Sequence, residues 1–272
     1  MKLLIAADME GIAGVVTWEH VDPDHKEYPR FRKLMTAEVN AAVRGAYEGG
    51  AEIVIVADGH AFGRNVLVEE LDPRARLHSG SPNPHGMVAG AAVDVDAAFF
   101  IGYHARAGTE NAILDHTWSS SRVANLWING DLVGETGLNA AICGHFDVPV
   151  VMVAGDQAVC REAAALLGEI ETVAVKEATG RMAAHCLAPE VAQLQIRKAA
   201  RLVAGRVQEG DVPEPLRMST PVTLTMEFPK SDMAEKAAVL PGAQRDERRV
   251  TATAEDMMEA FRAMRSMLAL AG

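Results

Sequence analysis

Four short runs of apolar residues recur along the chain, and the segment between the first two has the pattern of an amphipathic helix. The runs cover residues 3–7, 53–57, 97–103 and 148–154. A continuous apolar run is typical of a strand that is buried on both faces of a parallel sheet. Residues 30–48 place their apolar side chains at a 3.6-residue period, which indicates a helix. Strand, helix and strand in this order form a βαβ unit, so we predict an α/β fold with a mostly parallel sheet flanked by helices.

A hairpin is expected after the third of these strands. Residues 122–133 contain two apolar runs that are separated by Asn129-Gly130. Asn-Gly between apolar runs is the strongest short-range signal for a β-hairpin. A further helix is expected to begin directly after the hairpin, near Gly134 and Glu135.

Charge and hydropathy exclude two classes of partner. Lys and Arg number 26 against 37 Asp and Glu, which gives a net charge of −11. This sign argues against nucleic acid or an anionic membrane surface as the main partner. No apolar stretch approaches the roughly 20 residues that a membrane span needs, and no signal segment precedes the first strand.

The cysteines, Cys143, Cys160 and Cys186, form no CxxC pair and are expected to be buried, reduced thiols in helix-like segments. We therefore expect a soluble, cytoplasmic protein.

Two carboxylates follow the first apolar run. Asp8 and Glu10 are two residues apart, so if the chain stays extended both side chains lie on one face. Like charges held that close repel, and a bound cation removes the repulsion. The first residues therefore suggest a divalent metal site where the first strand ends. The alternative is a helix N-cap followed by a solvated Glu.

Two later strands also end in side chains that can bind a metal. His60 and His104 follow the second and third apolar runs, and ligands bind beyond the carboxyl ends of such strands. Mixed carboxylate and imidazole ligands suit zinc or a similar ion, and two ions could share Asp8. His116 is a further ligand, a free base or a loop residue. Glu135 alone is better explained as a favourable charge at a helix N-terminus.

Some polar residues near these positions have less defined roles. Asp58 could accept a hydrogen bond from the His60 imidazole or cap the turn that follows the strand. Asn139, one helical turn after Glu135, could contact substrate or a ligand. The remaining histidines are interpreted as solvated or structural; they are His20, His25, His78, His85, His145 and His185.

The pattern of the chain changes near residue 189. A long helix over 190–208 leads into a proline-bearing linker and an alternating strand at 222–228. Period-two alternation indicates a sheet with one solvated face. We predict an α/β metal-binding catalytic domain over 1–188. A smaller C-terminal α+β subdomain over 189–272 is expected to serve in oligomerisation and in closing the pocket.

Taken together, the motifs resemble one known family. They are Asp8-Met9-Glu10-Gly11-Ile12-Ala13-Gly14, Asp58-Gly59-His60, Gly102-Tyr103-His104-Ala105-Arg106-Ala107, Asp115-His116-Thr117 and Val133-Gly134-Glu135-Thr136-Gly137-Leu138-Asn139-Ala140. In this order along nearly the whole chain, they resemble the zinc-dependent D-aminopeptidase family associated with bacterial dipeptide transport. The resemblance implies a binuclear zinc centre with two ions per subunit. Its ligands would be Asp8, bridging both ions, with Glu10, His60, His104 and Glu135, and its catalytic histidine would be His116.

The resemblance also implies a substrate and an assembly. Members of the family remove N-terminal D-amino acids from short peptides such as D-Ala-D-Ala, and they form closed homo-oligomeric rings, decamers in the known example. Two other classes stay open from the residues themselves. One is another binuclear hydrolase, a phosphoesterase or deacetylase, although Arg64 and Arg106 are the only obvious cations near the ligands for a phosphate. The other is a non-catalytic metal-binding assembly protein.

Overall fold

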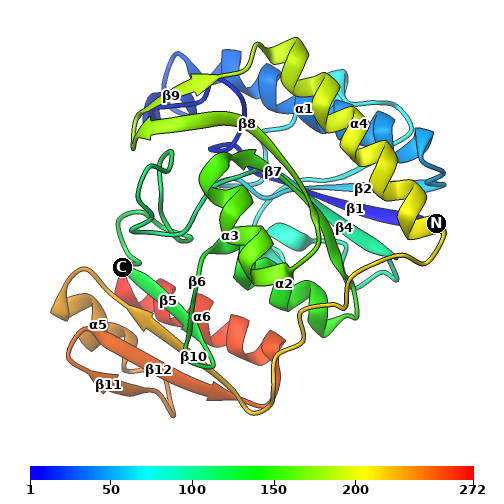
Figure 1. The fold of residues 1–272 in the computed structure, drawn as a ribbon. Helices are drawn as coiled ribbons and strands as arrows, with labels where there is room; N and C mark the ends of the chain where they lie inside the picture. The colour runs from blue at the N-terminus through cyan, green and yellow to red at the C-terminus, as the bar shows by residue number, and fades with distance from the viewer.

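A seven-stranded sheet forms the centre of the molecule. The computed structural model describes all residues from 1 to 272 (Figure 1). The strand order is β3-β2-β1-β4-β7-β8-β9. Neighbouring strands from β3 to β8 are parallel, and β9 is antiparallel to β8. The strands are β1 (Lys2–Ala7), β2 (Ile53–Asp58), β3 (Arg76–His78), β4 (Ala97–Tyr103), β7 (Val150–Asp156), β8 (Glu171–Gly180) and β9 (Ala183–Cys186).

Helices cover both faces of this sheet because its central strands are apolar on both sides. Leu3 and Ile5 of β1 pack with the core beneath α1 (Tyr28–Glu48) and α4 (Pro189–Gln208). Leu4 lies on the opposite face, in a second core with α2 (Glu135–His145) and α3 (Gln157–Leu167). Figure 1 shows α1 and α4 side by side across one face of the sheet. The short 3₁₀ helices are η1 (Trp18–His20), η2 (Val68–Glu70) and η3 (Gly86–Val88).

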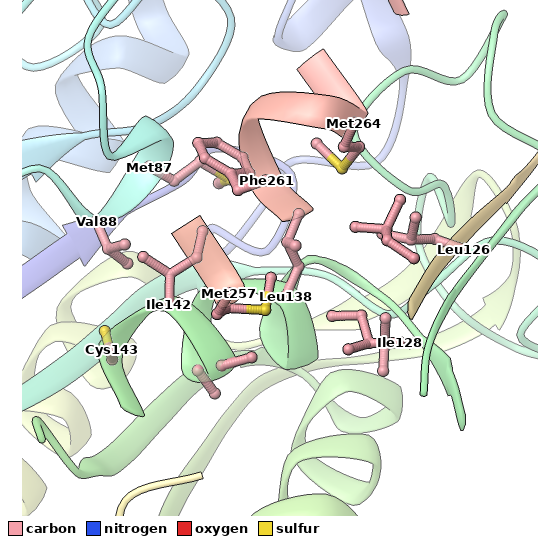
Figure 2. Packing of buried hydrophobic residues seen from close by; sticks show 14 of the residues in the cluster. Met87, Val88, Leu126, Ile128, Leu138, Ile142, Cys143, Met257, Phe261 and Met264 are labelled. Atoms are coloured by element: carbon pink, nitrogen blue, oxygen red, sulfur yellow. The ribbon is translucent and has the colours of Figure 1, made fainter. Parts of the chain in front are cut away.

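A second, antiparallel sheet lies below the first in Figure 1. Its strand order is β11-β12-β10-β5-β6. The strands are β5 (Asn125–Ile128), β6 (Asp131–Val133), β10 (Val222–Glu227), β11 (Gln244–Asp246) and β12 (Arg249–Ala254), and the unit adds α5 (Ser231–Ala237) and α6 (Met257–Ala271). Helix α6 joins the two units. Its residues Met257 and Phe261 belong to the same apolar cluster as Leu138 and Ile142 of α2 and Leu126 of β5 (Figure 2).

The predicted α/β class is confirmed, with helices on a mostly parallel sheet. The predicted hairpin at Asn129-Gly130 is present as β5 and β6. That hairpin comes from the range 1–188 but pairs with β10, so the second sheet draws strands from both predicted domains. Helix α4, from the range 189–272, packs on α1. The division into two domains at residue 188 stays a prediction.

The sequence pattern missed three edge strands. They are β3, β9 and β11, with three, four and three residues, which is too short for a clear periodicity. Cys143 and Cys160 are buried in helices as expected, but Cys186 lies exposed at the end of β9, so the prediction was wrong for that residue. None of the helices combines the length and the apolar character needed to cross a membrane.

Candidate metal centre and active site

The predicted ligands meet at one edge of the parallel sheet. Asp8 follows β1, and the histidines at 60 and 104 follow β2 and β4, the two strands that pair with β1. Glu10 comes two residues after Asp8, and Glu135 is the first residue of α2. All five side chains are buried. They come from four segments that are tens of residues apart in the sequence. Parallel strands place their carboxyl ends at one edge, and this geometry brings the side chains together.

Backbone contacts between the ends of β1 and β4 fix the relative positions of Asp8 and His104. The Asp8 N–H donates to the Ile101 carbonyl at 2.8 Å, and the Gly11 N–H donates to the Gly102 carbonyl at 2.7 Å. Gly102 has φ of +77°, and a β-carbon at that position would collide with the Asp8 carbonyl oxygen. Only glycine accepts both the conformation and the close approach.

The Asp8 carboxylate faces two different histidines. Its Oδ1 lies 3.4 Å from Nδ1 of His60, and its Oδ2 lies 3.5 Å from Nε2 of His104. On one side, Glu10 Oε2 is 3.1 Å from Nδ1 of His60. On the other side, Glu135 Oε1 is 3.2 Å from Nε2 of His104. The five side chains therefore form two half-sites that share Asp8.

Backbone carbonyls orient both imidazoles. His60 Nε2 donates to the Val21 carbonyl at 2.9 Å, and His104 Nδ1 donates to the Ala105 carbonyl at 3.0 Å. A carbonyl oxygen can only accept, so these nitrogens carry the ring hydrogen. In the neutral ring, the opposite nitrogen then presents a lone pair toward the carboxylates, as a metal-binding histidine does.

The donor atoms fit a bound transition-metal ion. The distances of 3.1–3.5 Å between imidazole nitrogens and carboxylate oxygens exceed the roughly 2.7–2.9 Å of a charge-assisted hydrogen bond. Two ligand atoms of one tetrahedral zinc, each about 2.0–2.1 Å from the ion, lie about 3.3–3.4 Å apart. Buried atoms of Asp8 (Oδ2), Glu10 (Oε2) and His104 (Nε2) have no hydrogen-bond partner. Metal ions bound in the two half-sites would satisfy these atoms.

Charges within the cluster are strongly coupled. Burial raises the pKa of Asp8 to about 7, and the nearby charge of Glu10 adds to the effect. Burial also opposes ionisation of Glu10 and Glu135, but the facing imidazoles outweigh it and hold the pKa of both carboxyls below the usual range. Burial disfavours the charged form of His60 and His104, yet the carboxylates outweigh it and hold each pKa well above its usual range. The carboxylates therefore favour any positive charge, a proton or a metal ion, placed among them.

His116 stands beside this cluster. Its ring stacks on that of His104 with the centroids 4.1 Å apart, and Trp18 packs edge-on against it at 5.4 Å. His116 Nδ1 donates to the Leu114 carbonyl at 2.9 Å, and Nε2 lies 3.6 Å from Glu135 Oε1. Burial, together with the charge of His104, lowers the pKa of His116. A neutral imidazole whose Nε2 faces the cavity can accept a proton.

Residues far away in the sequence hold the loop that carries His116. The Ile113 N–H donates to Asp156 Oδ2 at 2.7 Å. Arg181, in the turn between β8 and β9, donates to Asp115 Oδ1 at 2.6 Å and accepts from the Leu114 N–H at 2.9 Å. Sequence reasoning missed Asp156 and Arg181 as supports of the site, because no local pattern connects them to residues 113–116.

A buried lysine holds the loop that carries Glu10. Lys176 Nζ donates to the carbonyls of Glu10, Ile12 and Val15 at 2.5, 2.8 and 2.7 Å. Burial lowers the pKa of Lys176 to about 8. A lysine among the apolar residues of a strand could have been noticed in the sequence. The carbonyl groups to which it donates could not have been predicted from the sequence.

Two of the less defined residues have structural roles. Asp58 accepts from the backbone N–H groups of Asn65 and Val66 at 2.5 and 2.7 Å, so it caps the turn and does not pair with His60. Asn139 donates to the Tyr103 hydroxyl and to the Met87 sulfur, both at 3.1 Å. It lies in the core, and the expectation that it contacts substrate or a ligand was wrong.

The cluster opens into a cavity of about 540 Å³. This volume is in the range of small-ligand sites. Asp8, Glu10, His60, His116 and Glu135 line its inner end. The wall further out includes Trp18, Trp118, Ser119, Ser120 and Arg265. A small polar molecule can therefore reach the metal-binding cluster.

Fold and cluster define an α/β protein with a candidate transition-metal site at the carboxyl ends of its parallel strands. Residues 1–266 match the family described as D-aminopeptidase, peptidase M55. A D-aminopeptidase of Bacillus subtilis (strain 168) is 38% identical over 277 residues, which span 100% of this chain and 98% of the relative. A solved structure, the Zn-dependent D-aminopeptidase DppA from Bacillus subtilis, a self-compartmentalizing protease, has a TM-score of 0.95 at 37% identity and covers 100% of this chain and 98% of that one.

The chain therefore belongs to the peptidase M55 family of D-aminopeptidases, which confirms the resemblance seen in its motifs. It is a metallopeptidase, a hydrolase that acts on peptide bonds.

Proposed function

We propose that the protein uses two zinc ions per subunit to remove the N-terminal D-amino acid from short peptides such as D-Ala-D-Ala. The observation that carries this proposal is the Asp8 carboxylate, whose two oxygens face two different histidines beside an open cavity. A carboxylate placed in this way suits a bridge between two metals. The zinc dependence of the similar Bacillus subtilis enzyme supports the choice of ion.

Each ion would have its own set of protein ligands. Asp8, Glu10 and His60 would hold one, and Asp8, His104 and Glu135 would hold the other. When bound, zinc supplies Lewis-acid chemistry, because it polarises a carbonyl oxygen and makes a water molecule more acidic.

His116 would move the proton in this reaction. Its Nδ1–H is committed to the Leu114 carbonyl, so Nε2 is the atom that accepts and returns a proton. Its lowered pKa keeps the ring neutral near pH 7, as a general base requires. The rigid stack on His104 keeps this nitrogen beside the cluster.

A substrate panel combined with metal removal tests the proposed function. Dialysis against a chelator should abolish hydrolysis of D-Ala-D-Ala, and added zinc should restore it. L-Ala-L-Ala and p-nitrophenyl phosphate, assayed beside it, should be turned over poorly. Full activity of a metal-free preparation, or faster cleavage of the phosphate ester, would contradict the proposal.

Replacing His116 separates catalysis from metal binding. His116→Ala should retain both zinc ions but lose about 10²- to 10⁴-fold in kcat, the usual contribution of a general base. His185→Ala, at an exposed position on β9, is the matched control and should keep full activity. A His116→Ala enzyme with unchanged kcat would show that another group moves the proton.

The assembly is also a proposal. The similar Bacillus subtilis enzyme is a self-compartmentalizing protease, and we propose a closed homo-oligomeric ring, a decamer, for this chain. Light scattering on the purified protein would give the subunit number. A monomer that is fully active would contradict the proposed ring. A cytoplasmic location stays a prediction.

A further inference from the structure

Arg265 is the only lysine or arginine that lines the cavity. The other charged groups on the wall are acidic or are imidazoles: Asp8, Glu10, Asp22, Asp58, Glu135, His60 and His116. The cavity therefore contains several carboxylates, three of them in the metal-binding cluster, and one permanent cation on the wall contributed by α6.

Nothing acidic in the protein neutralises Arg265. No carboxylate lies within 4.0 Å of its guanidinium, whereas other arginines, such as Arg181 and Arg197, have such a partner. The hydrogen bond recorded for Arg265 runs from Nη1 to the Asn83 carbonyl at 2.6 Å. A guanidinium has five N–H donors, so most remain for a ligand. Arg265 is half-buried, and a partly desolvated charge favours a partner of opposite sign.

A short chain of contacts connects Arg265 to the metal-binding cluster. Its guanidinium carbon lies 5.8 Å from the centroid of the Phe261 ring, and Trp118 packs edge-on against Phe261 at 5.4 Å. The Trp118 N–H in turn donates to Glu135 Oε1 at 2.8 Å. Gly86, which also lines the cavity, has no side chain, and a β-carbon there would press on Phe261. The aromatic pair therefore holds Arg265 on the wall of the cavity that also contains the cluster.

We propose that Arg265 binds the C-terminal carboxylate of a short peptide substrate. This inference rests on the proposed hydrolysis of short peptides. A dipeptide whose scissile bond lies at the cluster has its free carboxylate one residue beyond that bond. The planar guanidinium can hold a carboxylate through two parallel hydrogen bonds, which gives both charge and orientation. Arg265 would then select peptides that end one residue after the cleaved bond.

The test compares D-Ala-D-Ala with its C-terminal amide, which has the same scissile bond but no terminal charge. The wild-type protein should have a KM about 10- to 100-fold lower for the free acid, the usual value of a charged hydrogen bond. Arg265→Gln should raise KM for the acid by this factor and leave KM for the amide unchanged. Arg265→Lys should recover part of the difference. Arg262→Gln, an exposed arginine on the same helix, is the matched control and should behave as wild type.

A merely structural role gives a different result. If Arg265 only supports the loop at Asn83, Arg265→Gln slows hydrolysis of the acid and the amide by the same factor, and the proposal fails.

A binding measurement tests the role of Arg265 separately from the proposed hydrolysis. Binding of D-Ala-D-Ala can be followed by the fluorescence of the tryptophans that line the cavity. Binding of D-Ala-D-Ala that requires Arg265 but leads to no cleavage would contradict the hydrolysis and support the anchor. A wild-type protein that neither binds nor cleaves either compound would overturn both.

Discussion

At the scale of single residues, the two carboxylates after β1 have different roles. Asp8 presents one oxygen to each half-site, whereas the close contact of Glu10, at 3.1 Å, is with His60. The distinction does not follow from their types or their spacing, since both are acidic residues at the end of one strand. It follows from the position of β1 between β2 and β4, which puts a histidine on either side of Asp8.

Substitutions of Asp8 and of Glu10 should remove different amounts of zinc from the protein. Asp8→Ala should empty both metal sites, because each half-site loses a ligand and about three protein ligands are needed to hold zinc. Glu10→Ala should weaken only the site that contains His60. Zinc content per subunit after dialysis, measured by atomic emission, checks this. Asp22→Ala, an exposed carboxylate on the cavity wall, should keep the full content. An Asp8→Ala protein with one firmly bound zinc would exclude the bridging role.

Glu38 should make stability depend on pH. Its Oε1 accepts from the Ala13 N–H at 2.8 Å, its Oε2 is buried without a partner, and burial raises its pKa from 4.5 to about 7 despite Lys176 nearby. A raised carboxyl pKa means that the folded protein resists ionisation. The contribution of Glu38 to stability is therefore highest below pH 4.5 and falls as the pH rises to about 7, by roughly 3 kcal/mol at about 1.4 kcal/mol per pH unit.

The variant Glu38→Gln isolates this contribution. The amide oxygen can still accept from the Ala13 N–H, and the side chain no longer ionises. Urea unfolding should show equal stability of the two proteins at pH 4 and a more stable variant at pH 8. A variant that is less stable than wild type at pH 8 would mean that the ionised Glu38 is stabilised in the fold.

That the candidate ligands meet in space could be predicted from the sequence for a physical reason. Asp8, His60 and His104 directly follow apolar runs, and the edge of a parallel sheet brings such positions together. Glu135 and His116 were assigned only through the family resemblance, because a glutamate at a helix N-terminus and a histidine in a loop are both common without a metal. Arg265 and Lys176 could not be found in this way, because their contacts join segments about 160 to 180 residues apart.

At the scale of secondary structure, the start of α3 is connected to the loop that carries His116. Asp156 caps this helix by accepting from the N–H groups of Ala158 and Val159 at 3.1 and 2.8 Å. Its second oxygen accepts from the Ile113 N–H, three residues before His116. One carboxylate therefore fixes the start of a helix and the position of the proposed base.

The strands and long helices were predicted well because each has a clear hydrophobic period, whereas these side-chain connections have no sequence pattern.

Asp156→Ala should reduce both stability and kcat. Loss of the cap costs about 1–2 kcal/mol, and the unpaired Ile113 N–H adds about 1–3 kcal/mol. Because the loop would move, kcat should fall while the zinc content stays unchanged. Asp256→Ala, which removes the cap of α6 at Glu259, is the control: it should lose about 1 kcal/mol and keep its activity. An active Asp156→Ala enzyme would show that the Arg181 contacts alone hold the loop.

At the scale of the whole molecule, the cavity is built by the parallel sheet and by α6 of the second unit. The side chains of the cluster lie at the carboxyl ends of the parallel strands, and α6 supplies Arg265. Between them, the β5–β6 hairpin pairs with β10 and leads directly into α2 and Glu135. The pairing of that hairpin with a strand about 100 residues later could not be predicted from local patterns, although the hairpin itself was.

Metal binding should therefore stabilise the molecule as a whole, because the ions would add links between the side chains that follow β1, β2 and β4 and the first residue of α2. A ligand at 100 times its Kd stabilises the folded state by about 2.7 kcal/mol, which corresponds to several degrees in Tm for a chain of this size. Calorimetry should show Tm rising by at least that amount when zinc is added to chelator-treated protein. Asp8→Ala should show almost no zinc-dependent shift, while Asp22→Ala should shift as the wild type does. A zinc-dependent Tm in the Asp8→Ala protein equal to that of wild type would place the stabilising ion outside this cluster.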